Sequence, residues 1–246
     1  MNLKDKLVKE ILDKTKYSGS LEPETKQISA SSYDLEPMQL YLRYKYGDIE
    51  RDEDLNATHL GSVLQLGFDQ IFTGPKYITA YRQKRILPNS WTVSGEIDLI
   101  DIENKAIIDF KLLSGAGYKK AIKKDSYISN MSIYRWLFNN DYPNSYLFAF
   151  NKAGSSVRGD QYEIVDLTDS LWDFDLVEEA LVSKTNEIQY MIDNPDEIPE
   201  CNIYEYGRNK EKLPNKCQYY CSFRDICPIY KKMINAHGYK KVKNLL

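Results

Sequence analysis

The chain has 246 residues, of which 42% are hydrophobic and 28% are charged, with a formal net charge of −3. This composition argues against a disordered chain and is typical of one compact unit with an apolar core. No apolar run is long enough to span a bilayer, and the first residues do not resemble a signal peptide. We therefore expect a protein that does not enter a membrane, and its four cysteines, three of them closely spaced, suit the reducing compartment of the cytoplasm.

Charge is distributed unevenly along the chain. Residues 161–206 contain thirteen Asp or Glu and one Lys, whereas residues 207–246 contain ten Lys or Arg and two acidic residues. Residues 111–135 contain six Lys or Arg and one Asp. Basic charge thus gathers in two segments that could contact phosphates, although an ordinary solvated surface would have the same composition.

Hydrophobic periodicity and turn residues predict the elements in chain order. An amphipathic helix is expected over residues 3–16, followed by a loop. The later helices are expected over residues 36–46, 56–72, 118–139 and 171–193. Strands are expected over residues 76–87, 91–101, 106–113, 145–150 and 161–167. This order predicts an α/β fold with a small mixed sheet flanked by helices.

The strands expected over residues 91–101 and 106–113 form a predicted hairpin that carries acidic residues. If its loop is centred between Glu103 and Asn104, partner numbers across the hairpin sum to 207. Asp98 then faces Asp109, with Cβ atoms about 4.5–5.5 Å apart, where like charges repel. A divalent cation between the two carboxylates would remove this repulsion. The pattern therefore predicts a metal site on the hairpin.

Strand alternation divides the hairpin into a polar and an apolar face. Asp109 and Lys111 are two residues apart and share a face, whereas Phe110 points to the other face, which we expect to be core. The same register places Glu96 opposite Lys111. Glu96 is either an additional metal ligand or the ion-pair partner of Lys111, and we favour the second interpretation.

These motifs resemble those of a known nuclease family. Gly95-x-x-Asp98 followed by Asp109-x-Lys111 is similar to the PD-(D/E)XK nuclease superfamily, in its RecB/Cas4-like exonuclease branch. The other motifs that carry the resemblance are Ile28–Ser32, Leu60–Gln65, Tyr127–Tyr134 and the cysteines at 217, 221 and 227. The resemblance implies a restriction-endonuclease-like core over residues 56–195, preceded by a helical segment over 1–55 and followed by a cysteine-bearing basic cap over 196–246.

The resemblance also implies a metal site for Mg²⁺ or Mn²⁺. Its ligands would be the carboxylates of Asp98 and Asp109, the backbone carbonyl of Phe110, and Gln65, which stands where the family usually has histidine. Lys111 would orient or deprotonate the attacking water and stabilise the transition state. Without the resemblance, Gln65 is equally well explained as a polar residue facing a groove.

Two further residues are assigned to the site by the helix motif. Asn130 stands where the family usually has glutamine, and Tyr134 lies one turn later on the same helix face. The resemblance implies that both contact the active site and the DNA. Taken alone, the same two residues could cap a helix or pack in a core.

The cysteines have the compact spacing of a metal or cluster site rather than a disulfide framework. Cys217, Cys221 and Cys227 lie within eleven residues, and Cys201 would be the fourth ligand because the upstream cysteine of related proteins is replaced by Glu36. The spacing fits a [4Fe–4S] cluster or tetrahedral zinc. The resemblance favours the [4Fe–4S] cluster, with zinc or no metal as alternatives.

The expected function is metal-dependent hydrolysis of DNA. The substrate would be DNA ends or single strands, in replication, recombination or repair, with a bacterium or a phage as the source. Two alternatives stay open: a Cas4-like DNA-processing subunit that needs partner proteins, and a DNA-binding or assembly protein that has lost turnover. A homo-oligomer and recombination or replication protein partners are compatible with all three.

Overall fold

The computed structural model describes residues 21–49, 55–113, 125–151, 162–198 and 221–231. The helix expected over residues 3–16 lies outside these ranges. The chain divides into two compact units. Of the described residues, the first unit contains Gln27–Asp34 and His59–Thr185, and the second contains the others.

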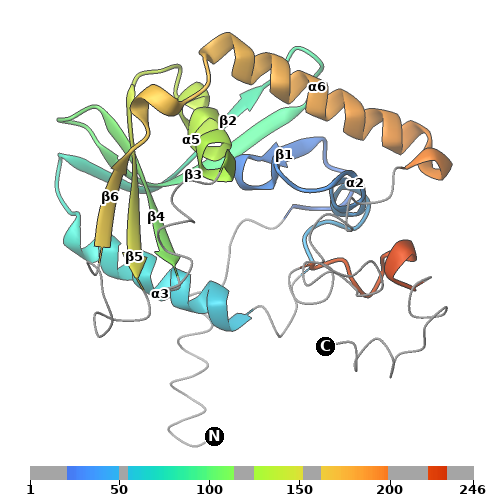
Figure 1. Cartoon of the computed structure of the whole chain (residues 1–246), viewed down its shortest axis with the longest axis horizontal. Helices are drawn as coiled ribbons and strands as arrows, with labels where there is room; N and C mark the ends of the chain where they lie inside the picture. Colours follow the sequence, from blue (N-terminus) through green and yellow to red (C-terminus); the bar gives the residue numbers. More distant parts are fainter. Residues whose placement is uncertain (1–20, 50–54, 114–124, 152–161, 199–220, 232–246) are drawn as a thin grey trace, which may run out of the picture. The chain divides into compact units, whose positions relative to one another are not determined.

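The first unit is built on a six-stranded mixed sheet (Figure 1). Its strands are β1 (Gln27–Ser29), β2 (Tyr77–Ile86), β3 (Thr92–Asp101), β4 (Ala106–Leu113), β5 (Asn144–Asn151) and β6 (Tyr162–Asp166). The strand order is β1-β3-β4-β5-β6, and β2 also pairs with β3. The β1–β3 and β4–β5 pairs are parallel, and the other pairs are antiparallel. The predicted α/β fold with a small mixed sheet is confirmed.

The loop expected before residue 36 contains a strand that periodicity does not reveal. Gln27, Ile28 and Ser29 form β1, which pairs in parallel with the first residues of β3. Three residues are too few to show alternation, and the hydrogen bonds that define this strand come from a partner more than sixty residues away. The expectation of a loop here was therefore wrong.

Four α-helices are described: α2 (Pro37–Tyr46), α3 (Leu55–Ile71), α5 (Asp125–Leu137) and α6 (Phe174–Asp193). All four correspond to predicted helices. The start expected for α5, residue 118, lies outside the described residues, and α6 begins three residues later than predicted, after a 3-10 turn at Thr168–Ser170. Within the described ranges, no helix combines the length and the apolar character that crossing a membrane requires.

Gly95 allows α5 to pack closely on β3. A Cβ atom built at Gly95 would lie 2.7 Å from the ring of Tyr134 and 2.8 Å from the side chain of Leu137, both on α5. Real Cβ atoms do not approach other atoms so closely. The absence of a side chain at Gly95 therefore sets the distance between α5 and the strand that carries Asp98.

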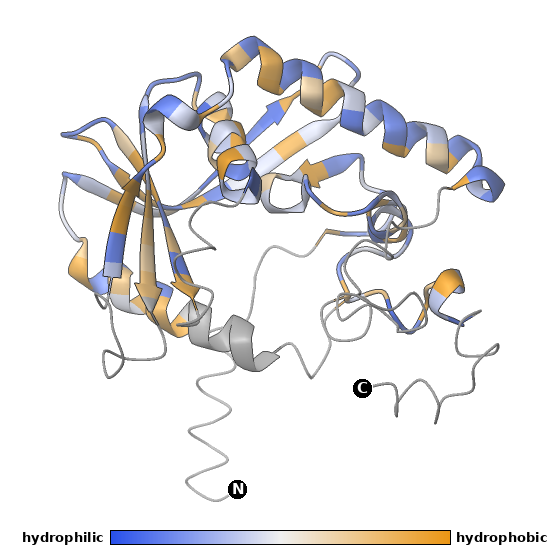
Figure 2. Cartoon of the chain, viewed as in Figure 1, coloured by the Kyte–Doolittle hydropathy of each residue, from blue (hydrophilic) through white to orange (hydrophobic). Residues whose placement is uncertain are grey.

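An aromatic cluster fixes the other helix near the site, α3. The Phe68 ring stacks on Phe110 of β4 with centroids 4.0 Å apart, and Phe72 lies 6.1 Å from the same ring. Phe148 and Phe150 of β5 extend the cluster. Figure 2 shows that much of β5 is hydrophobic. The prediction that Phe110 points into an apolar environment is confirmed.

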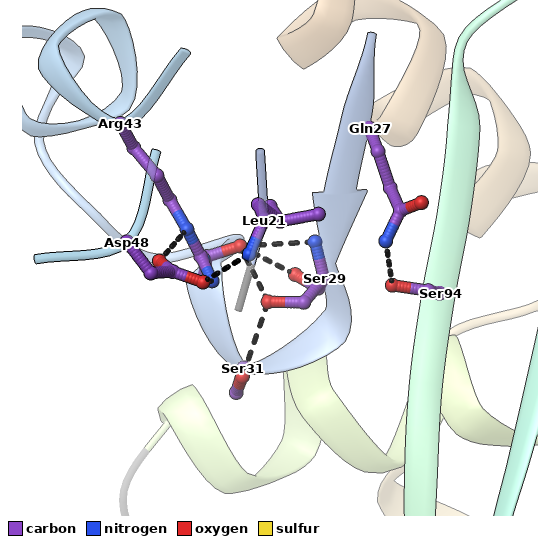
Figure 3. Close-up of polar contacts among 8 residues, drawn as sticks. Leu21, Gln27, Ser29, Ser31, Arg43, Asp48 and Ser94 are labelled. Atoms are coloured by element: carbon purple, nitrogen blue, oxygen red, sulfur yellow. Dashed lines mark hydrogen bonds and ion pairs between the residues drawn. The ribbon is translucent and has the colours of Figure 1, made fainter. Parts of the chain in front are cut away.

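The second unit has its own small core around α2. Met38 and Leu42 of α2 pack with Cys221 and Phe223, and all four side chains are at most 7% exposed. Arg43 near the end of α2 forms an ion pair with Asp48 at 2.6 Å, drawn in Figure 3. The cysteine segment and α2 are thus parts of one packed unit.

Candidate active site

The predicted hairpin register is confirmed. Leu99 pairs with Ile108, so that partner numbers sum to 207, and a four-residue loop joins β3 to β4. The regular ladder ends at this pair, one position before Asp98. There the Asp98 carboxylate accepts a hydrogen bond from the backbone N–H of Phe110 at 2.7 Å. Where the two strands separate, the carboxylate of Asp98 thus replaces a backbone carbonyl as the acceptor for the N–H of Phe110.

The opposite edge of β3 is also irregular at Asp98. Thr79 pairs with Leu99 and Tyr81 pairs with Ile97, but the pairing skips Ala80, whose φ is 48°. This left-handed backbone conformation costs a residue with a Cβ roughly 1–2 kcal/mol. Strained residues of this kind concentrate beside functional sites. Asp98 therefore stands at a point where β3 is free of regular pairing on both sides.

Asp109 and Lys111 meet on one face of β4, as their spacing predicts. The Lys111 ammonium lies 2.6 Å from the Asp109 carboxylate. The Asp109 side chain is 9% exposed and that of Lys111 is 31% exposed, so the pair is shielded from water on the carboxylate side. Among the described residues, Lys111 is the only one that forms an ion pair with the Asp109 carboxylate.

Burial and crowding make the acidic pair electrostatically unusual. Burial, and secondarily the Asp109 charge, raise the pKa of Asp98 from 3.8 to about 7, although Lys111 and the Phe110 N–H act in the opposite direction. Burial lowers the pKa of Lys111, but Asp109 and Asp98 together outweigh it, so that the net pKa of this lysine is raised. When both carboxylates are ionised, the site has more negative charge than Lys111 neutralises, and a bound cation would favour that ionised form.

Glu96 does not pair with Lys111 as predicted. Its carboxylate accepts two hydrogen bonds from the guanidinium of Arg82 on β2, at 3.0 and 2.5 Å. The prediction considered only β4 as a neighbour of β3, whereas β2 pairs along most of the other edge. Lys111 therefore pairs with Asp109, whereas Glu96 and Arg82 form a separate ion pair that is partly exposed to solvent.

Gln65 reaches the site from α3. Its side-chain nitrogen donates to the backbone carbonyl of Asp98 and to the carboxylate of Asp69, both at 3.1 Å. The structure therefore brings Gln65 to the residue with which the sequence motifs associate it. Its role as a metal ligand stays a prediction.

Asn130 and Tyr134 lie on α5, which faces the site. Tyr127, one turn before Asn130, interacts electrostatically with Lys111 and Asp109. Burial is the main cause that raises the pKa of Tyr127; Lys111 acts to lower this pKa and Asp109 to raise it. The Asn130 side-chain oxygen is buried and has no hydrogen-bond partner among the described residues. Tyr134 is 7% exposed and lies against Gly95, so its ring contributes to the core beneath the site. Their contacts with DNA stay a prediction.

The serine-rich motif after β1 connects the sheet to α5. Ser29 and Ser32 exchange hydrogen bonds, and the Ser29 hydroxyl lies 3.2 Å from that of Ser31 (Figure 3). Two residues later, Asp34 accepts a hydrogen bond from Ser129 of α5 at 2.7 Å. This motif therefore holds the helix that carries Asn130.

Only two of the four cysteines fall in the described residues. Cys221 is buried and accepts a hydrogen bond from the side-chain nitrogen of Gln39 at 3.4 Å, and Cys227 is half-buried in the same core. Cys201 and Cys217 lie outside the described residues. Binding of one metal cluster by all four cysteines therefore stays a prediction.

The donor atoms at the site suit a hard divalent cation. Among the described residues, no three His, Cys, Asp or Glu side chains are grouped to hold a metal. The available donors are instead the carboxylates of Asp98 and Asp109, the amide of Gln65 and the Phe110 carbonyl. All offer oxygen, which Mg²⁺ and Mn²⁺ prefer, and such sites keep several water ligands. The residues present therefore fit a Mg²⁺ or Mn²⁺ site.

Asp69 and Ala80 were missed by sequence reasoning. The four-residue spacing of Gln65 and Asp69 places them on one helix face, so their contact could have been found. The left-handed backbone at Ala80 leaves no signal, because alanine is not a residue that favours positive φ.

The chain is similar to known proteins in both sequence and structure. The model of the PD-(D/E)XK nuclease superfamily matches residues 3–228. No curated protein matches the sequence. The solved structure of the protein SSO0001 is 16% identical, with a TM-score of 0.59, and the match covers 94% of this chain and 98% of that one. At this identity the likeness shows the fold.

Two exonuclease structures have lower TM-scores. A phage-related exonuclease from Haemophilus somnus 129PT is 14% identical with a TM-score of 0.43, over 68% of this chain and 82% of its own. An alkaline exonuclease from Laribacter hongkongensis is 13% identical with a TM-score of 0.43, over 72% of this chain and 96% of its own.

Proposed function

The chain belongs to the PD-(D/E)XK nuclease superfamily, and from this premise we propose that it is a Mg²⁺- or Mn²⁺-dependent DNA nuclease. One observation carries the proposal. Asp98, Asp109 and Lys111 stand together where β3 and β4 separate, and the two carboxylates, when both are ionised, have more negative charge than the lysine neutralises. Stability alone does not require such a group, because buried like charges are costly unless a cation compensates them.

The residues divide the work of phosphodiester hydrolysis. Asp98 and Asp109 would hold the cation, with the carbonyl of Phe110 and the amide of Gln65 as further ligands. A bound divalent cation supplies activation of a water and neutralisation of charge on the phosphate. Lys111, held beside Asp109, would orient the attacking water and stabilise the negative charge that develops on the phosphate oxygens.

We propose an exonuclease that acts on DNA ends or single strands. This preference rests on the motifs shared with the RecB/Cas4-like branch, and the roles in replication, recombination or repair and in a phage rest on the same resemblance. The basic composition of residues 111–135 and 207–246 supports DNA as the substrate.

The cysteines are proposed to bind a [4Fe–4S] cluster that stabilises the second unit. Cys221 and Cys227 share a core with α2, so a cluster on them would reinforce the packing of that helix. Anaerobically purified protein should then contain iron and show the broad visible absorbance of such clusters. If the purified protein contains zinc and no iron, the cysteines form a tetrahedral zinc site instead of a cluster. The absence of both metals would refute the proposal.

The test of the proposed function is cleavage of DNA substrates that differ only in their ends. End-labelled single- and double-stranded linear DNA and a closed circle are incubated with Mg²⁺, Mn²⁺ or EDTA. We expect metal-dependent loss of the linear forms and no cut in the circle. Cutting of the circle would show an endonuclease. A folded protein that binds DNA but cuts none of the substrates would favour a Cas4-like subunit that needs partners, or a DNA-binding role.

A further inference from the structure

The side chain of Gln65 has two hydrogen-bond acceptors on the same side. One is the Asp69 carboxylate, one helical turn further along α3, and the other is the backbone carbonyl of Asp98 on β3. Both lie 3.1 Å from the side-chain nitrogen of Gln65. The amide of Gln65 therefore bridges α3 to the strand residue that supplies the first carboxylate of the proposed metal site.

These two acceptors fix the orientation of the amide. A glutamine amide has an NH₂ group with two hydrogens and a carbonyl oxygen with two lone pairs. If the two ends were exchanged, the carbonyl oxygen would face a carboxylate and a backbone carbonyl, neither of which can donate a hydrogen bond. The NH₂ group must therefore face Asp69 and Asp98. The side-chain oxygen, Oε1, then points away from both acceptors, and none of the described residues donates a hydrogen bond to it.

We infer that Asp69 is a positioning residue, which holds Gln65 so that its Oε1 is presented as a ligand for the divalent cation or for a water bound to that cation. The inference rests on the proposed function. Metal-binding histidines are oriented in a comparable way when their second ring nitrogen donates to a carboxylate. Here an amide takes the place of the imidazole, and Asp69 takes the place of the orienting carboxylate.

A simpler explanation is that Gln65 only connects α3 to β3. The two explanations differ in what removal of Asp69 does. If the contact is structural, Asp69→Ala changes the stability of α3 and leaves cation affinity unchanged. If Asp69 orients Gln65, the amide can rotate in Asp69→Ala, and cation affinity falls even when the protein remains folded.

The experiment measures the affinity for Mn²⁺ alone, by electron paramagnetic resonance, in folded protein without DNA. We expect Asp69→Ala to weaken Mn²⁺ binding roughly tenfold, the lower end of the range for residues that orient a ligand. Asp69→Asn should bind almost as the wild type does, because its side-chain oxygen can still accept from Gln65. Gln70→Ala is the matched control, since Gln70 is exposed on the same helix, and it should leave Mn²⁺ affinity unchanged.

A double-mutant cycle separates orientation from general electrostatics. In the Gln65→Leu background, Asp69→Ala should have no further effect on Mn²⁺ affinity. An equal loss in both backgrounds would show that the Asp69 charge acts without Gln65 and would overturn the inference. Wild-type affinity in Asp69→Ala would overturn it as well.

Asp98→Asn keeps this result distinct from a failure of the proposed function. If Asp98→Asn binds Mn²⁺ as tightly as the wild type, the proposed metal site itself is wrong. If Asp98→Asn loses binding while Asp69→Ala does not, only the role of Asp69 is refuted.

Discussion

Replacement of Asp98 by asparagine should stabilise the protein when metal is absent. The raised pKa means that folding makes the charged form of Asp98 unfavourable, and burial is the main cause. Asparagine has no charge to bury, and its side-chain oxygen can still accept the hydrogen bond from the N–H of Phe110. The mutation would thus remove a cost and keep a contact.

The magnitude follows from the pKa difference between the unfolded and folded states. A pKa that rises from 3.8 to about 7 corresponds to at most about 4 kcal/mol, at 1.36 kcal/mol for each pKa unit. The folded state binds the proton more tightly, so the unfolding free energy of the wild type falls as pH rises from 4 to about 7 and is then constant. The gain from Asp98→Asn should be near zero at pH 4 and largest above pH 7.

The assay is urea unfolding in EDTA across this pH range, with Glu103→Gln as the matched control. Glu103 lies in the loop of the same hairpin, with its side chain 61% exposed, and its replacement should show no comparable pH dependence. Added Mn²⁺ should stabilise the wild type and not Asp98→Asn, because a ligand that binds only the folded state raises its stability. A loss of stability in Asp98→Asn above pH 7, or a gain independent of pH, would refute the reasoning.

Three further substitutions test the site. Lys111→Met should abolish cleavage and lower the unfolding free energy of the metal-free protein by about 3 kcal/mol, since it leaves the buried carboxylate of Asp109 unpaired; unchanged stability in urea would contradict the ion pair. Gly95→Ala should cost about 1–3 kcal/mol, because its Cβ would overlap the ring of Tyr134, and an unaltered urea midpoint would contradict this contact. Glu96→Gln should cleave DNA at nearly the wild-type rate, because Glu96 pairs with Arg82; a loss comparable to that of Lys111→Met would return Glu96 to the active site.

Much of the fold could be predicted because its signals are local. The turn between Asp101 and Ala106 and the alternation on both sides of it were sufficient to give the hairpin register, which the pairing of Leu99 with Ile108 confirms. The partner of Glu96 was missed because the reasoning followed only the hairpin between β3 and β4. β2 and β3 form a second hairpin through the short connection Leu87–Trp91, and its register places Arg82 directly opposite Glu96.

The site itself was only partly readable from the sequence. Asp98, Asp109 and Lys111 follow from strand alternation. The hydrogen bond from the backbone N–H of Phe110 to the Asp98 carboxylate could not be predicted, because it forms only where β3 and β4 separate in three dimensions. The same holds for Gln65, whose contact with Asp98 is made across 33 residues.

The most direct test of the central claim is cleavage of end-labelled linear DNA in Mg²⁺ by the wild type, Asp109→Ala and Glu103→Ala, each verified as folded. The account predicts cleavage by the wild type and by Glu103→Ala, and none by Asp109→Ala or by any of the three proteins in EDTA. Equal cleavage by Asp109→Ala and the wild type would contradict the assignment of the active site to the point where β3 and β4 separate.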